Sequence, residues 1–400
     1  MEIKLDMMQT TALAVVMYYF GVWCKSKLKF LEKFCIPAPV VGGLIFSILH
    51  LILRQTNVLT FVFDNTLQKP FMMVFFTTIG LGASIQLIKK GGMQVITFWL
   101  ISLLLCILQN TLGIFLAKLT HQSALVGLLA GSITMTGGHG TAGAFGPEFE
   151  QIGVMGATTL AMAAATFGLV MGSLMGGPLG EKLIVNRGLK SNASEYEDSQ
   201  ITIAEKKEEV SYSELFKTLT LIFVSIGLGG ILEFLFKKIH FTLPSYVNAM
   251  FVAAVILNLG ESTGKWHINQ KCSNILGNIA LNIFLSLALI TLELWQLAAV
   301  AGPLLVILLG QTLLMALFAR FITFNLLGKD FDAAVLSAGH CGFGMGATAN
   351  GIANMDAIKE KFGPAPRAYF VLPIVGAFLI DITNTFVITL FVNLIKHLKL

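Results

Sequence analysis

The chain has 400 residues, of which 55% are hydrophobic and only 12% are charged, with a formal net charge of +5. Soluble domains carry about a quarter charged residues, so this composition excludes an ordinary soluble enzyme or nucleic-acid-binding protein and predicts an integral membrane protein. The small positive excess is better explained by basic residues gathered on one side of a membrane.

The first apolar run, near residues 7–24, is expected to be a membrane span and not a cleaved leader. Glu2, Lys4 and Asp6 precede it in place of a strongly basic segment, and no clear small-residue cleavage site follows it. The chain has five cysteines, none of them at Cys-x-x-Cys spacing. This argues against a disulfide framework or a structural zinc site.

Ten apolar segments are long enough to cross a bilayer as helices, for which about twenty residues are needed. They lie near residues 7–24, 37–53, 70–88, 93–118, 151–180, 214–236, 244–260, 274–294, 298–324 and 367–395. Two further runs, 124–147 and 332–355, are apolar but interrupted by glycine, and we expect them to be re-entrant segments. Residues 181–213 have mixed charge and few large apolar groups, which predicts an extramembrane linker.

The linker divides the chain into two related halves, residues 1–180 and 214–400. Ala130-Gly131-Ser132 corresponds to Ala338-Gly339-His340 at an offset of 208, and "LQN" around Gln109 corresponds to "GQT" around Gln311. The distribution of Lys and Arg favours a cytoplasmic linker and periplasmic termini. An odd number of spans in each half then inverts one half relative to the other. The predicted fold is therefore an all-α membrane protein of two inverted five-helix repeats, a pattern typical of secondary transporters.

The two glycine-rich runs are "ITMTGGHGTAGAF" (133–145) and "AGHCGFGMGATAN" (338–350). A helix broken at membrane depth leaves N–H and C=O groups that only protein or water can satisfy, so such backbone usually lines a cavity. Free N–H groups at helix N-termini attract carboxylates, and free carbonyls coordinate cations. We expect one run from each half to build a single site. Tight helix packing is the alternative, and we favour that alternative for "LVMGSLMGGPLG" (169–180).

Polar residues in the two runs are the candidate ligands. Hydroxyl and amide groups are offered by Ser132, Thr134, Thr136, Thr141, Thr348 and Asn350. The predicted substrate-binding residues are Ser132, Thr134, Gly137, Gly138, His139, Gly140, Thr141, His340, Gly344, Gly346, Thr348 and Asn350. For the two histidines, binding of a substrate carboxylate and local capping of backbone both stay open.

Asp381, in "FLIDITNTF", lies within an otherwise apolar span. A charge at that depth costs about 3 kcal/mol by some scales, which makes it a functional candidate. Asn384 and Thr385 follow three and four residues later, on the same helix face. With Asn110 they are the predicted Na⁺ ligands, because hard cations take oxygen ligands. A bond to a substrate ammonium or a purely structural aspartate are the alternatives.

Four long segments carry a resemblance to a known family: "LLAGSITMTGGHGTAGAF", "ATFGLVMGSLMGGP", "AAVLSAGHCGFGMGATANGIANM" and "VGAFLIDITNTFVI". They closely resemble the bacterial sodium/glutamate symporters, over nearly the whole chain apart from the linker. The resemblance implies Na⁺-coupled symport of L-glutamate across the bacterial inner membrane, with Na⁺ as coupling ion and no organic cofactor. Its Gly-Gly-x-Gly motif is Gly137-Gly138-His139-Gly140, whereas Ala349-Asn350 departs from the family, where proline is more usual.

Other functions fit the sequence less well. A Na⁺- or H⁺-coupled carrier of another small carboxylate is the main alternative. A channel would more typically have symmetric filters, and an intramembrane enzyme would need a catalytic motif that this sequence lacks. We therefore expect a transporter, not an enzyme, with the bilayer, Na⁺ and L-glutamate as partners and no nucleic acid. By analogy with carriers in which one part is held still, a homodimer is expected.

Overall fold

The computed structural model describes residues 2–191, 210–238, 243–297 and 300–398. In chain order, the elements of the first half are β1 (Glu2–Leu5), α1 (Met7–Lys27), α2 (Lys29–Lys33), α3 (Ala38–Gln55), β2 (Thr60–Phe63), α4 (Gln68–Gly80), α5 (Ile85–Leu119), α6 (Ala124–Leu128), η1 (Leu129–Ile133), α7 (Gly138–Gln151) and α8 (Ala157–Arg187). Those of the second half are α9 (Tyr212–Lys238), α10 (Ser245–Thr263), α11 (Gln270–Ile290), η3 (Leu294–Gln296), α12 (Ala301–Phe318), η4 (Ala319–Thr323), α13 (Phe324–Leu326), α14 (Phe331–Gly344), α15 (Thr348–Phe362), α16 (Pro366–Ile374), η5 (Val375–Leu379) and α17 (Ile380–Leu398).

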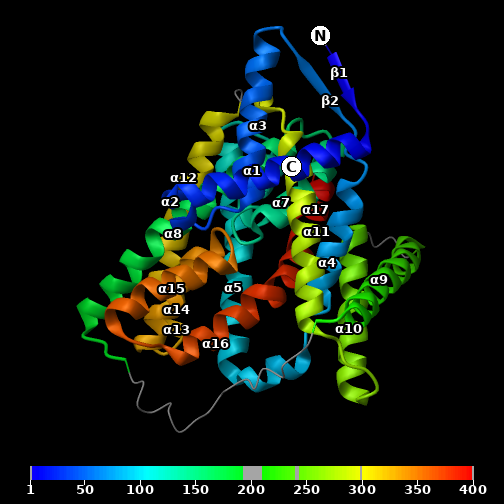
Figure 1. The fold of residues 1–400 in the computed structure, drawn as a ribbon. Coiled ribbons are helices and arrows are strands. Elements are labelled where there is room, and N and C mark those ends of the chain that lie inside the picture. The colour runs from blue at the N-terminus through cyan, green and yellow to red at the C-terminus, as the bar shows by residue number, and fades with distance from the viewer. Residues whose placement is uncertain (1, 192–209, 239–242, 298–299, 399–400) are drawn as a thin grey trace.

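The described chain is mostly helical, and the strictly all-α prediction needs one correction. β1 and β2 form a parallel two-stranded sheet, with Leu5 opposite Phe63, at the top of Figure 1. Phe61 and Phe63 of β2 pack against Phe46 with tilted and edge-on rings, so aromatic packing against α3 holds this strand in place. The strand is only four residues long, too short to stand out from the apolar sequence around it.

Seven described helices are long and apolar enough to cross a membrane: Met7–Lys27, Ala38–Gln55, Gly92–Leu119, Ala157–Arg187, Tyr212–Lys238, Gln270–Ile290 and Ala301–Leu326. They correspond to seven of the ten expected spans. The other three expected spans are helical, but their helices are not long and apolar enough to be counted among the seven. α4 has only 13 residues, α10 falls outside the seven, and the π-helical turn η5 separates α16 from α17.

Glycine lies at two of the helix boundaries in this region. α4 ends at Gly80, and a new helix starts after Ser84, whose hydroxyl accepts from Leu87 N–H. The expected span 70–88 is therefore divided. Gly92, with φ of 61°, kinks α5 and begins its spanning part. At the other boundary, α8 continues to Arg187 and enters the stretch 181–213 that the sequence assigns to the linker; residues 192–209 lie outside the described part.

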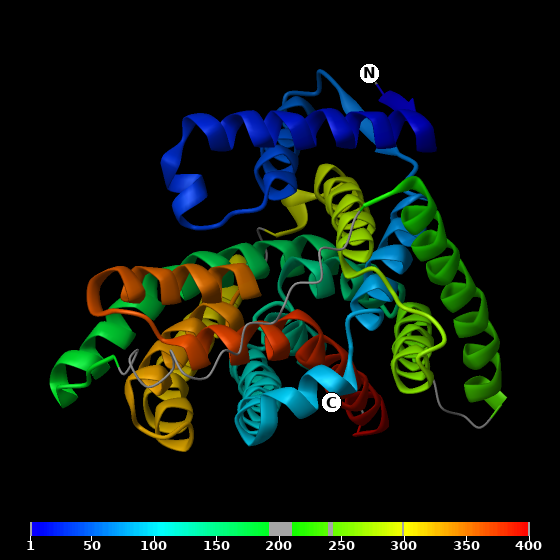
Figure 2. The same cartoon turned by 60° about the horizontal axis from the view of Figure 1, so that its bottom comes forward.

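The helices form two groups. α1, α3, α4, α9, α10 and α11 pack mainly on one another, and we call them the wall group. The core group consists of α5, α6, η1, α7, α8, α12, α14, α15, α16 and α17, which also pack mainly among themselves. Figure 2 shows α14–α17 gathered beside α5, apart from α1–α3. The contacts between the groups are fewer, and α11 against α7 is the most extensive of them.

Both glycine-rich runs lie in the core group as two helices that meet at a break. The first run comprises α6 and η1, then non-helical residues 134–137, then α7. The second comprises α14, then residues 345–347, then α15. Each break therefore places the N-terminus of a helix in the interior, since α7 and α15 both begin immediately after it.

Candidate functional site: a cavity where the two breaks meet

The two breaks meet at one cavity of about 250 Å³. This volume lies just below the roughly 300–1,000 Å³ of pockets for drug-sized ligands and suits a smaller molecule. The first run contributes Thr136, Gly137, His139, Gly140 and Thr141, and the second contributes Gly346, Ala347 and Thr348. Asp381, at the start of α17, completes the polar lining. Segments more than 200 residues apart in the chain thus form one site.

Two helix N-termini face this cavity without a side-chain cap. The residues before α7 and α15, Gly137 and Ala347, make no capping hydrogen bond. The first-turn N–H groups of a helix have no acceptor within the helix, and they carry the positive end of its dipole. Uncapped N-termini are therefore ready-made sites for anions. No Lys or Arg is found among the described residues that line the cavity, so these N–H groups are its main attraction for a carboxylate.

His139 lines the cavity, and its hydrogen bonds assign its tautomer. Its Nε2 lies 3.0 Å from the hydroxyl oxygen of Thr166, and that hydroxyl donates its own hydrogen to the carbonyl of Met162 at 2.8 Å. The Thr166 oxygen must therefore accept from His139, which assigns the proton to Nε2 by the hydrogen-bond network. Nδ1 is then an unprotonated acceptor, suited to an ammonium or hydroxyl group.

A second cluster of oxygens lies beside the first break. The N–H of Ser132 donates to Asn110 Oδ1 at 2.8 Å, and its carbonyl accepts from Asn384 Nδ2 at 3.0 Å. Within the described chain, Ser132 Oγ and Asn384 Oδ1 are buried without a hydrogen-bond partner. Buried polar atoms are normally satisfied, so unpaired oxygens at one place indicate a missing partner. Asp381 lies one helical turn before Asn384, on the same face of α17.

Among the described residues, no group of three or more His, Cys, Asp or Glu side chains is placed to hold a metal ion. A cation at this point would therefore use mainly neutral oxygens, which is what hard monovalent ions accept. Thr385 donates its hydroxyl to the backbone carbonyl of Asp381 at 2.7 Å. Its oxygen still has lone pairs that could accept a cation, but its main contact stabilises the first turn of α17.

Several predicted ligands do not line the cavity, because their polar atoms are already bonded to other parts of the protein. The His340 ring is fully buried between Phe98, Phe318 and Phe343, with Nδ1 2.9 Å from the Thr323 hydroxyl. The structure gives it a packing role. The Gly344 carbonyl accepts from Gln109 Nε2 at 2.7 Å.

Two further predicted ligands, Thr134 and Asn350, form hydrogen bonds with backbone carbonyls instead. Thr134 donates to the Leu129 carbonyl at 2.8 Å. Asn350 Nδ2 donates to the Leu169 carbonyl at 3.0 Å and fixes α15 to α8. Both side chains thus stabilise the broken segments from behind.

Gly138 joins the two runs directly. Its φ is +58°, and a Cβ built on it would lie 2.3 Å from the carbonyl oxygen of Gly346. Only glycine allows both this backbone conformation and this approach. By contrast, the run 169–180 packs helix on helix. Cβ atoms at Gly168, Gly172 and Gly176 of α8 would lie 2.5 to 2.8 Å from backbone carbonyls of the second run, the spacing of small residues that lets membrane helices touch.

The sequence model of the family described as sodium/glutamate symporter matches residues 3–364. The chain is 41% identical over 395 residues to the sodium/glutamate symporter of Escherichia coli (strain K12), covering 98% of each chain. The chain belongs to the sodium/glutamate symporter family. The symporter of Haemophilus influenzae (strain ATCC 51907 / DSM 11121 / KW20 / Rd) is 40% identical over 382 residues, 94% of each chain. The family assignment from the sequence is confirmed, and members of this family are transporters, not enzymes.

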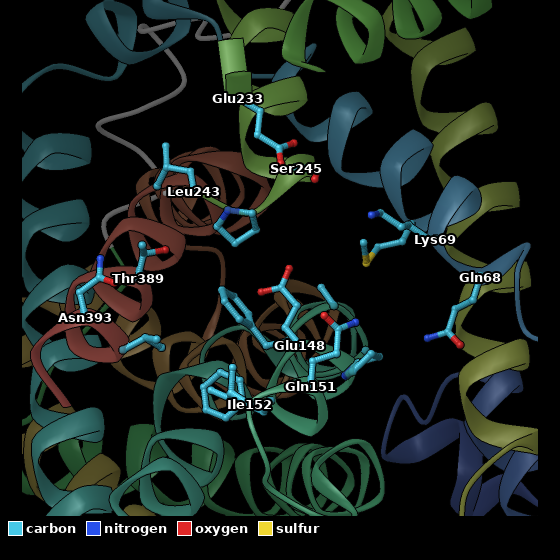
Figure 3. Close-up of a pocket in the computed structure, with 18 of the residues that line it drawn as sticks. Gln68, Lys69, Glu148, Gln151, Ile152, Glu233, Leu243, Ser245, Thr389 and Asn393 are labelled. Atoms are coloured by element: carbon cyan, nitrogen blue, oxygen red, sulfur yellow. The ribbon is translucent and has the colours of Figure 1, made fainter. Parts of the chain in front are cut away.

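A larger cavity of about 710 Å³ in this symporter-family chain is lined by other residues of α4 and α7, the helices that also contribute to the central site. In Figure 3 the carboxylate of Glu148 points into it, with Lys69 on another wall. Glu148 lies outside the candidate spans, and burial raises the pKa of its carboxyl to about 7. Asn65, Gln68 and Pro147 also line an adjoining cavity of about 540 Å³.

Aromatic rings lie between the central and the larger cavity. Tyr246 packs on Phe76 and Phe145, with ring centroids 4.4 and 6.0 Å apart, and Phe75 stacks on Phe284 at 6.0 Å. Sequence reasoning missed this layer and the rest of the apolar wall of the central site, which α4 and α11 supply. No signal could have found it, because its Phe and Leu residues resemble the lipid-facing ones in sequence.

Proposed function

We propose that this chain couples the inward movement of Na⁺ to the uptake of L-glutamate at the central cavity. The observation that carries the proposal is the convergence of two uncapped helix N-termini, those of α7 and α15, on one cavity without Lys or Arg in its described lining. A dicarboxylate offers one carboxylate to each N-terminus. The Thr141 hydroxyl adds a neutral donor, and His139 Nδ1 offers an acceptor for the substrate ammonium. The hydroxyls of Thr136 and Thr348 already donate to Gln109 Oε1 and to the Gly376 carbonyl, so they offer the substrate only oxygen lone pairs.

Na⁺ is proposed to bind beside the first break, where Ser132 Oγ and Asn384 Oδ1 lack partners within the described chain. Asp381 supplies the negative charge next to them, and Asn110 orients the backbone of Ser132. Because Asn384 also holds the Ser132 carbonyl, an ion here would stabilise the break that ends at the N-terminus of α7. Na⁺ binding and substrate binding would thereby be coupled through one short piece of backbone.

The architecture is proposed to consist of two inverted five-helix repeats, with residues 1–180 and 214–400 as the halves. The order of elements supports this: α3, α4, α5, the broken run and α8 of the first half have counterparts in α10, α11, α12, the second run and α16–α17. Gln109 and Gln311, at matching positions, meet in the structure, where Gln311 Nε2 donates to the Gln109 carbonyl at 2.7 Å.

The membrane orientation proposed for this chain places both termini on the periplasmic side of the bacterial inner membrane and the linker in the cytoplasm. The excess of Lys near residues 25–33, 89–90 and 359–361 supports it. α1 and α9 are largely exposed in the single chain, with 22% and 17% of their most apolar windows buried. These faces would meet lipid or, in the proposed homodimer, a second wall group.

Transport requires that the site face each side in turn, and the two helix groups suggest how. Every polar residue of the central site belongs to the core group, whereas the wall group contributes only Pro37 and apolar residues of α4 and α11. An apolar wall makes no directional bonds with the substrate. We therefore propose that the core group slides along the wall group with substrate and ion attached.

Uptake by the purified full-length chain in liposomes tests the function. Labelled L-glutamate should accumulate only with an inward Na⁺ gradient, and it should saturate. Proton-driven uptake without Na⁺ would show that H⁺ is the coupling ion. A preference for another small carboxylate would show that L-glutamate is not the main substrate. Non-saturable flux independent of Na⁺ would indicate a channel and overturn the proposal.

A further inference from the structure

A separate cavity of about 330 Å³ lies at the linker end of α8, between α8 and the end of α12 with the π-helical turn η4. It shares no residue with the central cavity or with the cavity at Glu148. Three basic residues line it, Lys182, Arg187 and Arg320, together with Asn186. No acidic residue is present among the described residues of its lining.

Along both helices that form this cavity, the lining changes from apolar to basic toward the C-terminal end of the helix. On α8, Pro178 and Leu179 come first in the chain and Asn186 and Arg187 come last, at the helix end. On α12, Leu317 precedes Arg320, one helical turn later. Both helices are candidate spans whose C-terminal ends line this cavity. The cavity is therefore apolar toward the membrane interior and basic toward the membrane surface, which is the polarity of a phospholipid.

The two arginine side chains are positioned by aromatic rings, which leaves their N–H groups available to a ligand. The guanidinium carbon of Arg187 lies 4.7 Å from the ring centre of Phe324, and that of Arg320 lies 5.4 Å from the ring of Phe321. Stacking of this kind uses the guanidinium face and leaves its N–H groups available. In the described part of the chain, none of the three basic residues forms an ion pair with a carboxylate.

Simpler explanations account for single residues only. Arg187 in the last turn of α8 interacts favourably with the helix dipole, and Lys182 can extend toward the surface from an apolar helix. Neither effect explains why Arg320, from another helix, lines the same cavity, or why no carboxylate neutralises the three charges. Mutual repulsion favours a bound anion instead.

We propose that this cavity binds the phosphate headgroup of an anionic phospholipid, with an acyl chain along Leu179, Leu183 and Leu317. Arg binds phosphate oxygens through paired N–H groups, and basic pockets between membrane helices are known to hold anionic headgroups. A free phosphate ion shares the headgroup chemistry, but it would leave the apolar half of the lining unused. The lipid is thus the occupant that matches both halves.

Native mass spectrometry of the full-length chain in detergent tests the proposal, with phosphatidylglycerol titrated against phosphatidylcholine of identical acyl chains. The wild type should bind phosphatidylglycerol at least tenfold more tightly. Each neutralised cation should weaken binding roughly fivefold, so the Arg187→Gln/Arg320→Gln double variant should lose about 25-fold. Lys265→Gln, at an exposed loop position outside the cavity, is the matched control and should bind as the wild type does.

Three results would overturn the proposal: equal binding of the two lipids, unchanged binding in the double variant, or inorganic phosphate alone binding as tightly as the lipid. The last would make this a small-anion site. If the double variant is not stably folded, the wild-type preference for phosphatidylglycerol must still weaken as salt is raised, since screening reduces charge-driven binding. A preference insensitive to salt would count against the three cations. Because the readout is lipid binding, it is independent of whether the chain transports glutamate.

Discussion

Replacing Gly138 with alanine should weaken substrate binding at the central site while leaving the protein folded. The backbone at Gly138 has φ of +58°, and a Cβ there would lie 2.3 Å from the carbonyl oxygen of Gly346. For an L-residue the left-handed conformation alone costs roughly 1–2 kcal/mol. The new methyl group must in addition push apart the two breaks that form the cavity.

The expected size of the effect follows from that strain. If the two breaks must meet to bind substrate, 1–2 kcal/mol corresponds to a loss of roughly 5- to 30-fold in glutamate affinity, and separation of the breaks adds to it. The assay is the KM of Na⁺-driven glutamate uptake in liposomes, with the amount of inserted protein measured in the same preparation. Gly177→Ala is the control, because a Cβ on Gly177 of α8 meets nothing within 4 Å.

The choice of control matters, because other glycines of α8 are not neutral. A Cβ at Gly172 would lie 2.8 Å from the Cys341 carbonyl, so its substitution would disturb the packing of α8 on α14. At Gly344 the nearest atoms are the side-chain ends of Leu105 and Met315, at 2.8 and 3.0 Å, which can move. We therefore expect a smaller effect at Gly344 than at Gly138. Wild-type KM and Na⁺ dependence in a well-inserted Gly138→Ala protein would refute the two-break site.

Three further predictions concern the cation, the larger cavity and the linker. Asp381→Asn should raise the Na⁺ concentration for half-maximal uptake roughly tenfold, the loss of one charged interaction of about 1.5 kcal/mol, with glutamate affinity at saturating Na⁺ retained. Reduced glutamate affinity at saturating Na⁺ would instead assign the carboxylate to the substrate ammonium, and Glu360→Gln, at an exposed position of α15, is the control. Because the pKa of Glu148 is raised to about 7, its carboxyl ionises between pH 6 and pH 8 and should attract Na⁺ more strongly as pH rises. Half-saturating Na⁺ should fall over that interval in the wild type and stay flat in Glu148→Gln, and parallel profiles would exclude this role. Shortening residues 192–209 with the connection kept should leave Na⁺-driven uptake measurable, and complete loss of uptake with normal insertion would contradict the linker assignment.

Much of the protein can be predicted from local sequence. A low content of charge and long apolar runs require a membrane environment, because hydrocarbon cannot solvate charged or unpaired polar groups. Clustered glycines predict broken helices, since glycine favours neither helix nor fixed dihedrals. Both breaks are present in the structure, between η1 and α7 and between α14 and α15. Four long segments, among them "LLAGSITMTGGHGTAGAF" and "AAVLSAGHCGFGMGATANGIANM", also indicated the family that the family model confirms.

The facing of individual side chains was decided only by the tertiary structure. His139 and His340 stand in similar glycine-rich surroundings in the sequence, yet His139 lines the cavity and His340 is enclosed by aromatic rings and bonded to Thr323. Thr136 lines the cavity, whereas Thr134, two residues earlier, turns back to the Leu129 carbonyl. Helical periodicity places residues on a common face of one segment, but it does not say which distant segment covers that face. That choice depends on packing between parts of the chain more than 200 residues apart, such as Ser132 with Asn384, and no local pattern encodes it.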